Sequence, residues 1–174
     1  AGKHIEEMLG QGMEQREASE TDIEQAQNRL FRLNESNSGE RVAMLRAELQ
    51  DVMQNHFGVF RRGDFMQDGI KKLAALRERI ANVHLEDKSQ TFNTARIEAL
   101  ELENLFEVAE ATAIVAEARN ESRGAHARDD FRERDDENWL CHSMYFPNDK
   151  RVAKRDVNFS PKIVDTMEPQ IRSY

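Results

Sequence analysis

One stretch of eleven residues gathers the side chains of this sequence that could do chemistry. Residues Glu121 to Phe131 read ESRGAHARDDF. Arg123 and Arg128 could hold a carboxylate, because a guanidinium presents paired N–H donors, and His126 could relay protons near neutral pH. Alternatively, the stretch follows the end of a helix, where Arg and His side chains complement exposed carbonyls and the helix dipole. The residue types favour the helix end and leave the anion site open.

The rest of the sequence offers no self-sufficient catalytic or metal-binding constellation. It contains no GxGxxG, GxxxxGK[ST] or GxSxG motif. No pair of its five histidines has the HExxH spacing, and the single Cys141 excludes a CxxC zinc site. The triplet Arg62-Gly63-Asp64 falls at an expected helix start, where capping explains it. We therefore expect no catalytic residue, no bound cofactor and no metal site in this chain.

The acidic residues from Asp129 to Glu137 do not form a calcium loop. They lack the oxygen-ligand spacing and the central glycine of an EF-hand. They alternate with Arg128, Arg132 and Arg134. This pattern predicts a salt-bridged surface.

Composition narrows the class of protein. The 174 residues suffice for one domain, and 33% charged with 39% apolar residues suits amphipathic helices with solvated outer faces. A net charge of −8 argues against a general nucleic-acid binder. There is no apolar run of membrane-spanning length, the first residues lack a signal-peptide core, and a single cysteine suits a reducing compartment. We predict a location in the cytoplasm or on the cytoplasmic side of an assembly.

Long helices are expected to position the ESRGAHARDDF stretch. All three prolines lie at or after Pro147, which permits long helices before that point. Apolar residues recur at helical spacing in four segments. The stripes are Ile23, Ala26, Leu30 and Leu33; Val42, Leu45, Leu49 and Val52; Ile70, Leu73, Leu76, Ile80 and Val83; and Ile97, Leu100, Leu105, Val108, Ala111 and Val115, widened by Leu102 and Phe106. We expect them to form the core of an antiparallel bundle of three or four helices.

Several residues predict where these helices begin and end. Ser19, Asp64 and Asn93 are plausible N-caps. Phe92 can pack against Ile97 as a hydrophobic staple. A left-handed glycine, Gly124, is expected to end the fourth helix.

The last fifty or so residues lack the helical pattern of the preceding segments. Residues 142–146 and 152–159 can pair as short strands around a turn at 147–149. The segment has too few apolar residues for a core of its own, so it must lie on another surface. That surface need not be the bundle.

Five segments, taken in their order along the chain, carry a resemblance to a known protein family. They are FRRGD at 60–64, EALELENL at 98–105, ESRGAHAR at 121–128, RDDENWL at 134–140 and IRSY at 171–174. In this order they resemble the C-terminal part of the succinate dehydrogenase flavoprotein subunit, over essentially the whole chain. The wider family, including fumarate reductase and L-aspartate oxidase, shares the Ser-Arg-Gly element more loosely. Arg132 departs from the proline that bacterial members often carry there.

The resemblance implies a mainly α fold. It comprises a spectrin-repeat-like antiparallel three-helix bundle and an irregular C-terminal tail with a short β-hairpin. Residues 1–12 would be a remnant of the helix leaving a missing flavin domain, 13–122 the bundle and 123–174 the tail.

The resemblance also implies a function for a longer protein. The intact subunit would oxidise succinate to fumarate with covalent FAD and pass electrons to an iron–sulfur subunit. The residues that grip FAD and substrate would lie upstream, so this fragment would be a structural and docking module, inactive alone. Its partners would be the flavin-binding domain and the iron–sulfur subunit. It would meet the membrane only through the complex, on the cytoplasmic side of a bacterial inner membrane.

Three residues then become candidates for contacts between domains. Arg123, His126 and Arg128 are expected to meet the flavin domain. The alternatives left open are the equivalent part of a fumarate reductase or L-aspartate oxidase, and a stand-alone helical module that binds a partner protein.

Overall fold

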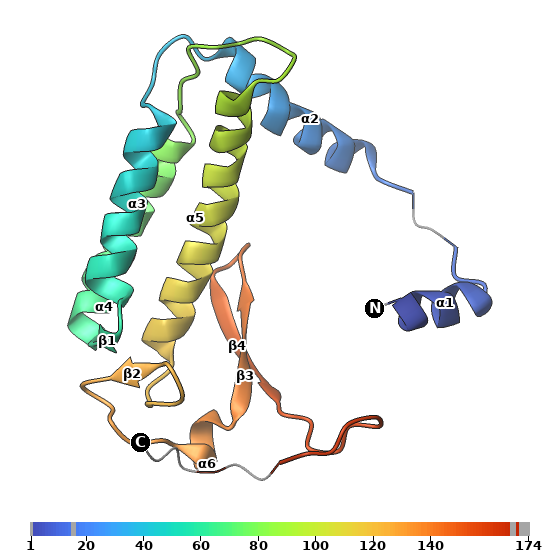
Figure 1. Cartoon of the computed structure of the whole chain (residues 1–174), viewed down its shortest axis with the longest axis vertical. Coiled ribbons are helices and arrows are strands. Elements are labelled where there is room, and N and C mark those ends of the chain that lie inside the picture. Colours follow the sequence, from blue (N-terminus) through green and yellow to red (C-terminus); the bar gives the residue numbers. More distant parts are fainter. Residues whose placement is uncertain (1, 15–16, 168–169, 171–174) are drawn as a thin grey trace.

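The computed structural model describes residues 2–14, 17–167 and 170, so the IRSY segment at 171–174 lies outside the described residues. Helices dominate, and the strands form two short pairs, one parallel and one antiparallel (Figure 1). The elements are α1 (Gly2–Gly10), α2 (Glu20–Glu35), α3 (Val42–Phe57), β1 (Phe60–Arg61), α4 (Gly63–Ile80), α5 (Thr94–Ala118), β2 (Ala127–Arg128), α6 (Asp136–Trp139), β3 (Cys141–Phe146) and β4 (Arg151–Asp156). The predicted mainly α class with a C-terminal hairpin is confirmed.

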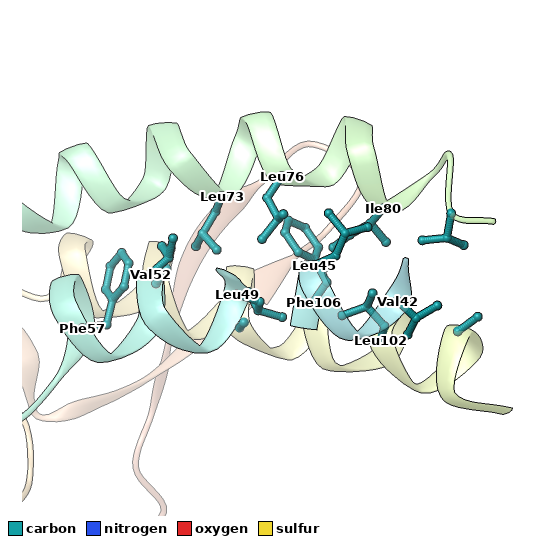
Figure 2. Close-up of a cluster of buried hydrophobic side chains, with 14 of the residues drawn as sticks. Val42, Leu45, Leu49, Val52, Phe57, Leu73, Leu76, Ile80, Leu102 and Phe106 are labelled. Atoms are coloured by element: carbon teal, nitrogen blue, oxygen red, sulfur yellow. The ribbon is translucent and has the colours of Figure 1, made fainter. Parts of the chain in front are cut away.

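Three helices, α3, α4 and α5, lie side by side and form an antiparallel bundle (Figure 1). Their facing side chains make one apolar core (Figure 2). The stripes predicted for α3 and α4 are confirmed, since their members are buried except for the partly buried Ile70. Burying one such aliphatic side chain contributes about 1.5–3 kcal/mol, so this core is the main source of stability.

The face predicted for α5 is only partly right. Leu102 and Phe106 are buried as expected, but Ile97 is 55% exposed and Val108 is 65% exposed. Besides Leu102 and Phe106, the face that packs in the bundle carries Ala99, Ala109, Ala113 and Ala116. Because alanines are small, α5 can approach α3 and α4 closely along this face.

The helix α2 lies outside the bundle core, so its predicted stripe is largely uncovered. Leu33 is buried, but Ile23 and Leu30 are 47% and 44% exposed. Polar contacts attach α2 to α5: Arg29 Nε lies 2.8 Å from a Glu103 carboxylate oxygen. Of the four residues in this stripe only Leu33 packs into the apolar core, and side-chain hydrogen bonds make the rest of the attachment.

Two of the predicted N-caps are confirmed. The Ser19 hydroxyl accepts from the Asp22 N–H at 3.1 Å, and the Asn93 side chain accepts from the Arg96 N–H at 2.8 Å. The staple beside Asn93 is wrong, because Phe92 is 98% exposed.

Asp64 is not an N-cap. The helix α4 begins one residue earlier, at Gly63, and Asp64 instead pairs with Arg62 at 2.6 Å. The Gly63 N–H donates to Asp130 Oδ2 at 2.8 Å, so a residue far along the chain satisfies the start of α4.

The predicted hairpin is confirmed, with Cys141 opposite Asp156 and Phe146 opposite Arg151. It lies against α5, so the bundle does support this part of the tail (Figure 1). A buried carboxylate holds it there: Glu110, on α5, accepts from Tyr145 Oη at 3.1 Å and from Lys150 Nζ at 3.0 Å. Burial and the nearby Glu110 charge raise the pKa of Tyr145 to about 12.

Candidate functional site

The ESRGAHARDDF stretch forms a loop at the end of the bundle where β1 and β2 meet (Figure 1). The helix α5 ends at Ala118, and Gly124, with a φ of 57°, lies in a turn beyond it. Two backbone hydrogen bonds close this turn, Arg123 N to His126 O at 2.9 Å and His126 N to Arg123 O at 3.0 Å. The expectation that Gly124 ends the helix is therefore wrong. It provides the left-handed conformation that the tight turn requires.

Arg128 closes the end of α5. It is only 3% exposed, and its Nη1 donates to the carbonyls of Ala116, Glu117 and Arg119 at 3.2, 2.9 and 3.3 Å. The first two are among the last carbonyls of α5, which have no partner within the helix itself, and the third belongs to the residue that caps the helix. The helix-end interpretation is confirmed for this arginine.

The same arginine connects α5 to α4. Arg128 Nε and Nη2 donate to the two carboxylate oxygens of Asp130 at 2.7 and 2.8 Å. Asp130 also accepts from the Gly63 N–H at the start of α4. The hydrogen bonds from Arg128 hold the pKa of Asp130 well below its usual range, so this carboxylate stays charged.

A second arginine, Arg61, connects the end of α3 to the same loop. Arg61 Nε lies 3.2 Å from the carbonyl oxygens of both Phe57 and Gly58. Its Nη1 lies 2.8 Å from His126 Nδ1. The ends of α3 and α5 and the start of α4 thus converge on one hydrogen-bonded group. We call Arg61, Arg119, Glu121, Arg123, His126, Arg128 and Asp130 the end joint.

His126 is held neutral in the end joint. Because an arginine N–H points at Nδ1, this nitrogen must accept, and Nε2 then carries the hydrogen and donates to the Arg119 carbonyl at 3.1 Å. Burial, helped by the positive charges of Arg61, Arg128 and Arg119, lowers the pKa of His126. The site therefore does not favour a proton relay near neutral pH.

We expect this histidine to make stability pH-dependent on the acid side of neutrality. In the unfolded chain His126 takes up a proton near pH 6.5, whereas in the folded chain it stays neutral to lower pH. The unfolded state then binds more protons, so the free energy of unfolding falls as the pH drops below about 6.5, by at most about 1.4 kcal/mol per pH unit. Urea unfolding at steps between about pH 7 and 5 measures this slope.

The matched variants are His126→Gln and, as a control, His142→Gln at an exposed position in strand β3. Above pH 7 His126 contributes no pH dependence, because it is neutral in both states. We expect His126→Gln to flatten the slope and His142→Gln to leave it as in the wild type. An unchanged slope in His126→Gln contradicts the assignment.

The centre of the end joint is a glutamate that sequence reasoning missed. Glu121 is 0% exposed. Its carboxylate accepts from Arg123 at 2.8 and 3.0 Å, from the Asp135 N–H at 2.9 Å, and from Arg119. Burial alone would raise the pKa of Glu121, but these hydrogen bonds outweigh it and hold the pKa below the ordinary value. The alternation Arg119-x-Glu121-x-Arg123 was the available signal, since alternate residues of an extended segment share a side.

Arg119 extends the end joint to the hairpin. Its guanidinium donates to the carbonyls of Trp139 and Cys141 at 2.9 and 2.6 Å and to Ser143 Oγ at 3.1 Å. The same group lies 5.1 Å from the centre of the Trp139 ring. One side chain at the end of α5 therefore positions the base of the hairpin.

The charges of this region mostly compensate each other. Arg123 Nη2 lies 2.6 Å from Asp136 Oδ1, and Arg134 Nη2 lies 2.7 Å from Asp136 Oδ2. The predicted salt-bridged surface is confirmed for these residues. Arg123 and Arg128 bind carboxylates of this chain, so the geometry favours a structural role over an anion site.

The geometry also bears on cofactors and metals. A groove of about 500 Å³ runs between α2, α4 and α5, but paired charges such as Arg32 with Glu103 and Arg77 with Glu107 line it. The sequence has no glycine-rich loop of the kind that holds the phosphates of a dinucleotide. Among the described residues, no group of three or more His, Cys, Asp or Glu side chains is placed to hold a metal ion.

The described helices include no candidate membrane span. Over residues 2–14, 17–167 and 170, none combines the length and the apolar character needed to cross a bilayer.

Comparison with known proteins gives a consistent result. Residues 46–174 match the family described as "Fumarate reductase flavoprotein C-term". The succinate dehydrogenase flavoprotein subunit of Coxiella burnetii is 47% identical over 171 residues, which is 98% of this chain and 29% of that protein. The mitochondrial succinate dehydrogenase flavoprotein subunit of Oryza sativa is 40% identical over 83% of this chain and 24% of its own length. The chain thus spans less than a third of these relatives.

Solved structures share the fold. A quinol–fumarate reductase with menaquinol molecules superposes with a TM-score of 0.81 at 36% identity, covering 91% of this chain and 29% of its own. The E. coli quinol fumarate reductase gives 0.72, also at 36% identity, over 84% of this chain and 27% of its own. An adenylylsulfate reductase from Archaeoglobus fulgidus, 20% identical, covers 92% of this chain and 28% of its own with a TM-score of 0.69, and shows the fold alone.

Proposed function

The chain belongs to the C-terminal domain family of fumarate reductase and succinate dehydrogenase flavoproteins, and we propose that it is the helical C-terminal domain of a succinate dehydrogenase flavoprotein subunit. The observation that carries this proposal is the 47% identity to the Coxiella burnetii subunit over 98% of the chain. The intact subunit would oxidise succinate to fumarate with covalent FAD and pass electrons to an iron–sulfur subunit. The complex would lie on the cytoplasmic side of a bacterial inner membrane, with this domain peripheral to it.

Within that subunit the domain would be a structural and docking module. The end joint supports this role, because its buried charged groups bind one another and the backbone rather than an open site. The division into a leading helix at 1–12, a bundle at 13–122 and a tail at 123–174 is part of the same proposal. FAD and the catalytic residues would belong to the remainder of the subunit.

Two preparations test the proposal: the present chain alone, and the longer subunit encoded with it, co-expressed with its iron–sulfur partner. We expect flavin absorbance and succinate-dependent reduction of an artificial electron acceptor only in the longer form. Stoichiometric FAD binding by the chain alone contradicts the docking role. A longer subunit without flavin, or without succinate oxidation, contradicts the enzyme assignment.

Fumarate reductase is the second candidate. It is favoured by the family description and by the two quinol–fumarate reductase structures. The same preparation separates the two, because the rates of succinate oxidation and fumarate reduction can be measured on one sample with dyes of different potential. A preparation that reduces fumarate much faster than it oxidises succinate favours the second candidate.

We propose that Arg123, His126 and Arg128 belong to the side of the domain that meets the flavin domain. The three differ in accessibility. The Arg123 side chain is 27% exposed, whereas that of Arg128 is 2% exposed. Arg123 would make direct contacts from the tip of the turn, and Arg128 and His126 would position that turn.

Arg123→Ala in the longer subunit tests this contact. The variant loses the pairs with Glu121 and Asp136 and the proposed contact to the flavin domain. We expect a several-fold lower yield of assembled, flavin-loaded subunit, with an unchanged KM for succinate in the fraction that assembles. The control is Arg155→Ala on exposed strand β4. Normal assembly with a raised KM contradicts the proposal.

A further inference from the structure

The helix α5 carries two apolar faces, and the bundle covers only one. The buried face consists of Ala99, Leu102, Phe106, Ala109, Ala113 and Ala116. On the other, Ile97 is 55% exposed, Leu105 is 42% exposed and Val108 is 65% exposed. A helix with apolar side chains on more than one face is typical of a helix that is covered on more than one side. The second face of α5 therefore lacks a partner among the described residues.

The neighbouring helix α2 has the same property. Ile23 and Leu30 are about half exposed, and Phe31 is 53% exposed. Arg29, the residue before Leu30, binds Glu103 and Asn104 on α5 at 2.8 and 2.6 Å. The uncovered side of α2 therefore flanks its contact with α5. Figure 1 shows α2 leaving the N-terminal end of α5 at an angle, while the hairpin lies toward the C-terminal end.

Six residues thus define what we call the outer face: Ile23, Leu30, Phe31, Ile97, Leu105 and Val108. The side of the bundle formed by α3 and α4 is different. There Met44 is exposed on α3 and Phe65 on α4, where Arg62 lies 4.3 Å from the centre of the Phe65 ring, and Val59 and Phe60 are exposed in the connection between the two helices. Of the four long helices, α2 and α5 carry six exposed large apolar side chains between them, whereas α3 and α4 carry one each.

We infer that the outer face packs permanently against the flavin-containing remainder of the same subunit. This inference rests on the proposed function. The relatives carry about 70% of their length outside the matched part, which is ample for a larger domain to cover the two helices. The outer face is aliphatic and aromatic, and permanent interfaces are more apolar than transient ones. The short helix α1, which precedes α2, continues the pattern, with Ile5 57% and Leu9 63% exposed.

The experiment places one carboxylate at each of two equally exposed positions. Val108→Asp lies in the outer face, and Met44→Asp, 66% exposed on α3, is the matched control. In the longer subunit we expect Val108→Asp to reduce the yield of soluble, flavin-loaded protein about tenfold, because a charge would enter a dry interface. Met44→Asp should leave the yield unchanged. Leu30→Asp on α2 should act like Val108→Asp.

Thermal unfolding of the present chain alone shows whether a substitution destabilises the domain itself or only the proposed interface. Both positions are solvated there, so we expect Val108→Asp and Met44→Asp to shift its Tm by the same small amount. Equal yields of the two variants in the longer subunit overturn the inference. So does a wild-type subunit that self-associates and that Val108→Asp converts to a monomer with full flavin content, since the outer face would then bind a second copy.

These outcomes differ from a failure of the proposed function. If the wild-type longer subunit binds no flavin and oxidises no succinate, the proposed function fails. If the wild type is active and Val108→Asp is equally abundant and active, only the assignment of the outer face fails.

Discussion

Glu121→Gln is expected to lower the free energy of unfolding by about 3 kcal/mol, a large part of the stability of a small domain. Glutamine keeps the shape of the side chain, but it removes the negative charge and offers one acceptor oxygen in place of two. The guanidinium groups of Arg119 and Arg123 and the Asp135 N–H all point at this carboxylate. Without the charge, the two arginines face each other with one charged partner fewer. Breaking a buried ion pair on one side costs more than the pair itself contributes.

Thermal unfolding of the wild type and variant measures the effect, and a loss of this size corresponds to about 10 °C in Tm for a chain of this length. The control is Glu137→Gln, which removes the same charge from an exposed position in α6. We expect the control to unfold within about 2 °C of the wild type. Equal Tm values for the two variants contradict a central role for Glu121.

The sequence predicted some features of the end joint and not others. A helix end next to ESRGAHARDDF was predictable, because arginine and histidine complement exposed carbonyls. The hydrogen-bond partners of these side chains were not predictable, because they come from distant parts of the chain. Arg61 binds His126 across 65 positions, and Asp130 binds the Gly63 N–H across 67. Only the packed fold decides which charged residues of a helical protein meet.

The fold itself was predictable where one face of a helix is clearly apolar. The stripes on α3 and α4 were identified correctly because polar residues occupy their other sides. On α5 the prediction was only partly right, because apolar side chains occur nearly all around the helix. Large residues such as Ile97 and Val108 drew the prediction toward the outer face. The bundle instead buries the face with Ala109 and Ala113, because small side chains allow three helices to approach closely.

The same substitution is expected to destabilise the chain much more on the buried face of α5 than on its exposed face. Leu102 is 0% exposed and Leu105 is 42% exposed, although both are leucines in one helix. Leu102→Ala is expected to lower the free energy of unfolding by about 3 kcal/mol, since it opens a cavity between packed helices. Leu105→Ala is expected to cost less than about 1 kcal/mol, because water already reaches the leucine.

Urea unfolding of the present chain, followed by far-UV circular dichroism, measures both variants. We expect a lower midpoint for Leu102→Ala with an unchanged m-value, which indicates a loss of stability and no change in the surface exposed on unfolding. In the longer subunit the two variants should differ less in their loss of stability, because the outer face that contains Leu105 would be covered there. If Leu105→Ala is the more damaging change in the chain alone, the bundle packs through the face that periodicity first suggested and the arrangement in Figure 2 is wrong.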